Sequence, residues 1–158
     1  MALKGDRTET VQDIKYFMNE EAERGGIVVM STASSGVGLD SSVQLATYTY
    51  TSGNYPVGIL MQDMVNVDQT KYHINQYKDE AQMGSKVRIL RQGWVVTDMV
   101  YPGQTPVKGS LGYVGHSGYI SNLSTTHPSA ANLAIGRFET TKDEDGFVNF
   151  YVNLPNIG

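Results

Sequence analysis

Short runs in which apolar and polar residues alternate, separated by turn-forming residues, constrain this chain more than any other feature of its sequence. The clearest pair lies near the C-terminus, where residues 134–140 and 147–154 flank the acidic turn Asp143-Glu144-Asp145-Gly146. Every second residue of 147–154 is a large apolar one, which is the period of a strand that buries one face. The pattern therefore predicts a β-hairpin.

Similar runs predict strands elsewhere in the chain, at residues 27–30, 43–51, 57–61, 86–90 and 94–101. We expect 43–51 and 57–61 to be neighbours across one turn, and the last two to form the centre of the sheet. Residues 66–84 and 103–134 are polar or rich in glycine, and they predict long loops. The fold class is therefore mostly β, with one β-domain over residues 27–158.

Residues 1–26 precede this domain and carry much of the charge. Their apolar residues fit two patterns, a helical face through Val11, Ile14 and Met18 and a short strand at residues 16–18. The choice between helix and strand stays open. A Gly-Gly pair ends the segment, which we interpret as an N-terminal arm or edge element.

Composition excludes several classes of function. The chain has no cysteine, and its 12 Lys and Arg against 16 Asp and Glu give a net charge of −4, so we expect no nucleic-acid partner. We interpret the basic group Lys86, Arg88 and Arg91 as the solvated face of a strand. No signal peptide or run of ~20 apolar residues is present. We therefore expect synthesis in the cytoplasm and no membrane partner.

The acidic turn invites interpretation as a calcium loop, because such loops space oxygen ligands before a glycine. With Gly146 at the sixth position, Thr141 falls at the first and Val152 at the twelfth. Both positions need a carboxylate in an EF-hand. A hairpin turn in which Gly146 takes a positive φ is the better interpretation.

Two further motifs lack a residue that their chemistry needs. Ser117 follows a glycine by two residues, as in a nucleophile elbow, but Tyr119 occupies the position of the second glycine. His73, His116 and His127 stand in three separate segments without the short spacing of a metal site. We therefore expect no catalytic residue, no metal and no cofactor.

Aromatic residues are the remaining candidates for binding. Tyrosine and tryptophan combine a large apolar surface with a polar tip, which suits protein interfaces. The candidates for an oligomer or partner interface are Trp94, Tyr101, Tyr113 and Tyr119.

Two segments resemble the head-decoration, or cement, proteins of tailed bacteriophages. The first is Pro56-Val57-Gly58-Ile59-Leu60, and the second runs from Lys86 to Pro102 through Gly93-Trp94 and an acidic residue shortly before the proline. Gly136-Arg137-Phe138-Glu139, with the closing hairpin, is similar to the end of phage head proteins. The resemblance covers about residues 56–154.

The resemblance implies a compact β-barrel, β-tulip or sandwich-like domain that assembles as a homotrimer on the outer surface of the capsid. Its partner would be the major capsid protein, and its place the virion. The extended arm would add a strand to a capsid-protein sheet, and the candidate arm residues are Val11, Ile14, Tyr16, Phe17 and Met18. Such a role needs no chemistry, so we expect a protein that is not an enzyme.

Three alternatives remain open. One is a ligand-binding or glycan-binding β-sandwich that uses Trp94 and exposed tyrosines as a stacking platform, provided that Trp94 is exposed. Another is a minor virion protein of the tail or of receptor binding. The third is a small hydrolase built on Ser117 with His116 or His127 and an aspartate.

Overall fold

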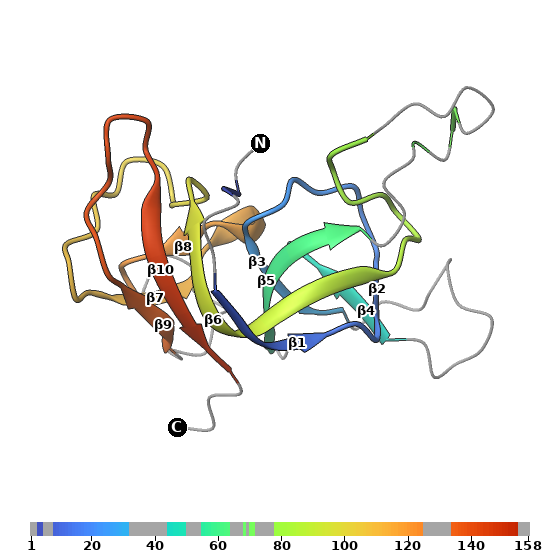
Figure 1. The fold of residues 1–158 in the computed structure, drawn as a ribbon, viewed down its shortest axis with the longest axis horizontal. Helices are drawn as coiled ribbons and strands as arrows, with labels where there is room; N and C mark the ends of the chain where they lie inside the picture. Colours follow the sequence, from blue (N-terminus) through green and yellow to red (C-terminus); the bar gives the residue numbers. More distant parts are fainter. Residues whose placement is uncertain are drawn as a thin grey trace.

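The computed structural model describes residues 3–4, 8–31, 44–49, 55–63, 68, 70–71, 78–124 and 134–154. Within them the regular structure is almost entirely β, and the strands join into one large open sheet (Figure 1). The strands are β1 (Thr8–Asp13), β2 (Tyr16–Met18), β3 (Ile27–Met30), β4 (Gln44–Thr47), β5 (Pro56–Asp63), β6 (Val87–Thr97), β7 (Leu111–Val114), β8 (Ile120–Ser121), β9 (Ala134–Phe138) and β10 (Val148–Asn153). The prediction of a mostly β domain is confirmed. The barrel form of that prediction is wrong, because the sheet does not close.

Strand β6 connects the two halves of the sheet. β5 pairs with its first half, from Leu90 back to Val87, and β10 pairs with its second half, from Thr97 back to Gln92. β1 pairs with the stretch of β6 from Ile89 to Trp94, which includes residues that also pair with β5 and residues that also pair with β10. Because each strand has two edges, β1 must lie along the edge of β6 opposite to β5 and β10. One half of the sheet then continues as β5-β3-β4-β2 and the other as β10-β9-β7-β8 (Figure 1).

Three sequence predictions about these strands are wrong. Residues 86–90 and 94–101 are not two strands, because β6 continues through Gly93, whose φ of 148° accommodates a bend. β4 and β5 are not neighbours, since β3 lies between them. Residues 103–134 are not only loops, because they contain β7 and β8.

Two clusters of buried side chains form the core. The first draws on both halves of the sheet, for example Ile27 and Ile59 from one half and Val95 and Phe150 from the other. It therefore holds the two halves together. The second covers the opposite face of the first half, so β3 is buried on both sides, with Val28 in this second cluster.

A pair of glycines makes room for the buried ring of Phe150 in the C-terminal half. Gly112 of β7 and Gly136 of β9 lie opposite each other, and Phe150 of β10 lies against both. A Cβ at Gly112 would stand 2.4 Å from the Phe150 ring, and one at Gly136 would stand 1.9 Å from the Tyr151 carbonyl oxygen. Any larger residue at either position would therefore displace the ring or the strand.

Candidate binding edge and candidate binding face

The N-terminal segment forms strands and lies against the rest of the domain. β1 runs antiparallel to β6, and a bridge between Leu3 and Thr97 extends the contact, with the Lys4 N–H donating to the Val96 carbonyl at 2.9 Å. The Leu3 side chain is buried in the first core cluster. The choice between helix and strand is thus settled in favour of strand for β1 and β2.

The five candidate arm residues fall into two groups. Tyr16 and Met18 are buried in the second core cluster, and Phe17 is half-buried beside Lys86. Val11 and Ile14 are 41% and 50% exposed. Only these two offer a broad apolar surface to a partner.

Charged side chains clamp β1 to β6. Arg91 makes two bonds to one oxygen of Asp13, at 3.0 and 2.9 Å, and Arg88 bonds a carboxylate oxygen of Glu9 at 2.8 Å. The Arg88 and Arg91 side chains are only 18% and 17% exposed. The interpretation of these arginines as a solvated face is therefore wrong, since they bind the N-terminal strand.

The outer edge of β1 is unpaired within the part of the chain that the structure describes, where β6 is the only strand that pairs with it. The register of the pairing shifts on each side of Val11, with an extra residue on β1 at the first shift and an extra residue on β6 at the second. The extra residue on β1 shortens the regular stretch that its edge offers, so a strand added here would make a short contact. We call this edge, with Val11 and Ile14, the arm edge.

We expect the Asp13 contact to make the domain acid-sensitive. Burial would raise the pKa of Asp13, but the Lys15 N–H and the Arg91 guanidinium outweigh it and hold this pKa below the ordinary value of 3.8. The stabilisation is present above the unfolded-state pKa and is lost as the pH falls through the lowered folded-state pKa. Urea unfolding at neutral pH and at about pH 2.5 should therefore show a smaller acid-induced loss in Asp13→Asn than in the wild type. Equal losses would contradict this account.

A row of side chains crosses the outer face of the C-terminal half. Trp94 of β6 lies opposite Tyr151 of β10, Tyr151 lies opposite Arg137 of β9, and Arg137 lies opposite Leu111 of β7. Directly opposed residues share a face of a sheet. We call these four residues the outer row.

Trp94 is exposed, which answers the question that the sequence left undecided. Trp94 is 37% exposed, and its ring centroid lies 4.8 Å from that of Tyr151 at an interplanar angle of 41°. The indole Nε1–H donates to Glu139 Oε1 at 3.1 Å. Both the position and the orientation of the ring are therefore held by neighbours on the same face.

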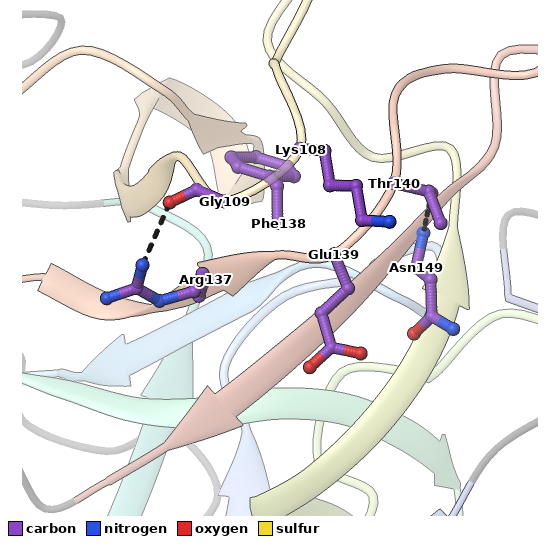
Figure 2. A pocket seen from close by; sticks show the side chains of 7 residues that line it. All are labelled: Lys108, Gly109, Arg137, Phe138, Glu139, Thr140 and Asn149. Carbon is purple, nitrogen blue, oxygen red and sulfur yellow. Dashed lines mark hydrogen bonds between the residues drawn. The ribbon is translucent and has the colours of Figure 1, made fainter.

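A hollow of about 410 Å³ shares one residue, Arg137, with the outer row. Figure 2 shows the residues that line it. It is lined by Lys108, Gly109, Arg137, Phe138, Glu139, Thr140 and Asn149. Figure 2 shows the Glu139 carboxylate and the Asn149 amide side by side and pointing the same way. Arg137 donates to the Gly109 carbonyl at 3.1 Å, and the Asn149 N–H donates to Thr140 Oγ1 at 2.9 Å.

The four predicted interface aromatics do not come together. Tyr101 and Tyr119 meet edge to face at 6.3 Å, and Tyr119 packs against the second core cluster. Tyr113 is half-buried on β7, opposite Ser121. Of the four, only Trp94 belongs to the outer row.

The turn that contains Ser117 packs against the core. Ser117 is exposed and left-handed, with φ 55° and ψ 35°, and strand β8 follows it rather than the helix that a nucleophile elbow requires. A Cβ at Gly118, whose φ is +83°, would stand 2.6 Å from the Tyr48 ring. The conformation of this turn thus fits its packing on Tyr48.

The acidic turn is a hairpin turn. Asp143 Oδ1 accepts the N–H groups of Asp145 and Phe147, at 2.9 and 2.8 Å, and Gly146 has the predicted positive φ, at +85°. The carboxylate is therefore engaged with its own backbone.

No group of three or more metal-binding side chains occurs among the described residues. His73 and His127 lie outside these residues. Nor does any helix there have the length and apolar character that crossing a bilayer requires.

Most residues of the outer face are not among the candidates that the sequence suggests, namely Tyr151, Arg137, Leu111, Glu139 and Asn149. A signal for part of it was present, because Asn149 and Tyr151 alternate with the buried residues of the closing hairpin. The pairing of β9 with β7 carried no such signal, since β7 was not predicted as a strand.

No protein-family model matches the chain, and no curated protein matches it in sequence. The resemblance to decoration proteins stays a prediction.

Proposed function

We propose that this chain is a virion structural protein that binds the outside of a mature phage capsid and stabilises the shell, docking through the arm edge. The observation that carries the proposal is that β1 is clamped to β6 on one side while its other side takes no strand from the described residues. A strand held in this way is preorganised to extend into a partner's sheet.

The exposed side chains on this edge fit the same role. Val11 is the one large apolar residue of β1, and Ile14 follows directly after the strand ends. Both are exposed, and neither belongs to a core cluster. Main-chain hydrogen bonds to an added strand would supply affinity, and these two side chains would select the partner. The major capsid protein is the partner that the sequence resemblance implies.

The short edge suits a protein that acts in many copies. The register shifts beside Val11 limit how far pairing with an added strand would extend, so we expect each contact to be weak by itself. A homotrimer would place three such edges on the lattice at once, and linked weak contacts reinforce each other strongly. Because a bound ligand stabilises the state it prefers, the decorated mature shell would resist heating better than the bare one. Sedimentation of the purified protein measures the trimer directly.

Charged substitutions on the arm edge should weaken capsid binding. We expect Val11→Asp combined with Ile14→Asp to weaken co-sedimentation with expanded heads of the parent phage by at least about tenfold, equivalent to about 1.4 kcal/mol, because an unpaired charge would be buried in the contact. Both side chains are substantially exposed, so folding should be retained.

The matched control is Val107→Asp, which changes an exposed valine that is 64% accessible and lies outside the N-terminal segment. It should bind like the wild type. Wild-type binding by the double variant would contradict docking at the arm edge, and failure of the wild type to bind expanded heads would overturn the proposed function itself.

A further inference from the structure

We infer that the hollow beside Trp94 and Tyr151 is a binding site for an oligosaccharide built of pyranose rings. The first observation is the aromatic surface at its side. Trp94 and Tyr151 are in contact on the outer face, and Trp94 is 37% exposed. Neither ring lines the hollow, but Trp94 is bonded to the lining residue Glu139 and Tyr151 lies opposite the lining residue Arg137. Exposed, rigid aromatic rings offer a flat apolar surface to the C–H face of a sugar ring.

The polar groups beside these rings match the hydroxyl groups of a sugar, which donate and accept hydrogen bonds. Glu139 uses Oε1 to hold Trp94, and Oε2 has no partner among the described residues. Lys108 has no ion-pair partner within them either. An acceptor and a donor therefore line the same hollow.

Asn149 adds an independent observation. Its Oδ1 is buried and has no hydrogen-bond partner. A buried acceptor without a partner costs about 1–3 kcal/mol, so such atoms in native proteins call for a ligand or a bound water. Asn149 lines the hollow next to Glu139 (Figure 2), and because its Oδ1 is shielded from solvent, a ligand hydroxyl would reach this oxygen once the Asn149 side chain turns toward the hollow.

The framework of the site is rigid. The Glu139 N–H donates to the Asn149 carbonyl at 2.8 Å, and the Lys108–Gly109 segment is tied to β9 because the Gly109 N–H donates to the Phe138 carbonyl at 2.7 Å. The volume of about 410 Å³ lies within the range of small-ligand sites. Neither Arg137 nor Glu139 needs to move to admit a ligand from solvent, because both line the open hollow.

This inference goes beyond capsid binding and does not depend on it. The saccharide site uses none of the arm-edge side chains, so either proposal can fail alone. A decoration protein with such a site would carry a sugar-binding surface on the virion.

The single tryptophan of the chain makes the test direct, because all indole fluorescence comes from Trp94. The purified full chain is titrated with cellohexaose, maltohexaose, chitohexaose, oligogalacturonate and bacterial lipopolysaccharide. We expect a saturable change in emission with at least one of these probes. A response to lipopolysaccharide alone would indicate a cell-surface source, and a response to a free oligosaccharide would indicate a soluble one.

Variants then locate the site. Asn149→Ala and Lys108→Ala should each weaken binding of the responding probe by about tenfold, which corresponds to about 1.4 kcal/mol. Tyr55→Ser removes another exposed tyrosine outside the site and should bind like the wild type. Circular dichroism checks that each variant is folded. Unchanged fluorescence with every probe, together with a blank glycan array, would overturn the inference, as would equal binding by Asn149→Ala and Tyr55→Ser.

Discussion

Phe150→Ala is expected to lower the free energy of unfolding by about 3–5 kcal/mol, the usual cost of deleting a buried aromatic side chain. Phe150 is fully buried, meets Phe138 edge to face at 5.0 Å, and covers the glycine pair of β7 and β9. The substitution would leave a cavity that β7 and β9 cannot fill, because Gly112 and Gly136 have no side chains. Chemical denaturation measures the loss.

Two controls make this prediction specific. Asn153→Ala changes an exposed residue on the same strand and should alter stability by less than about 0.5 kcal/mol. Gly112→Ala should be costly in the wild type, where the new Cβ would meet the Phe150 ring, and less costly when Phe150 is already alanine. Additive effects of these two substitutions would contradict the described packing.

Tyr48→Ala is the second change with a large expected effect, again about 3–5 kcal/mol. The Tyr48 hydroxyl donates to the Glu23 carbonyl and accepts the Gly26 N–H at 3.1 Å, and its ring packs against Gly118. This one side chain therefore joins the 23–26 turn to the turn before β8. Thermal unfolding followed by circular dichroism measures the loss.

Tyr48→Phe separates the hydroxyl from the ring. It keeps the packing but leaves the Glu23 carbonyl and the Gly26 N–H without their partner, so we expect a cost of about 1–3 kcal/mol. Burial raises the pKa of the Tyr48 hydroxyl, and the nearby carboxylates of Glu23 and Glu20 raise it further. The group therefore remains a donor through the neutral range, and the cost should not vary with pH there. A stability equal to that of the wild type would contradict the two hydrogen bonds.

The parts of the fold that sequence predicted well are those in which local pattern and tertiary environment agree. In the closing hairpin, Val148, Phe150 and Val152 are buried and the residues between them are not, as strict alternation requires. The positive φ of Gly146 followed from the need for a turn. Both features depend on neighbours close in sequence.

The incorrect predictions concern strands that pair with segments distant in the sequence. β3 lies between β4 and β5 and contributes side chains to both core clusters, and nothing in residues 43–61 indicates the insertion. The glycine-rich composition of residues 103–134 predicts a loop where β7 lies, yet one of these glycines, Gly112, is required by the Phe150 ring from another strand. The outer row depends on the same long-range register, which is why only Trp94 of its four residues was a candidate.

The N-terminal segment shows a third kind of limit. The hydrophobic periodicity of β1 is weak because the side chains that bind it to β6 are charged. Arg88 and Arg91 contribute more to this contact than buried apolar residues do. Ion pairs between segments far apart in sequence leave no trace in a hydrophobic pattern. β1 and β2 each lie at an edge of the sheet, and nothing in the sequence indicates their partner strands.

Hydrogen–deuterium exchange of the arm edge, measured on the free protein and on the protein bound to expanded heads, tests the central proposal most directly. If β1 extends into a capsid-protein sheet, amides of residues 8–13 that exchange quickly in the free protein should become protected on binding, and the protection should disappear in the Val11→Asp, Ile14→Asp variant. Protection that appears elsewhere while residues 8–13 exchange as before would contradict docking through this edge.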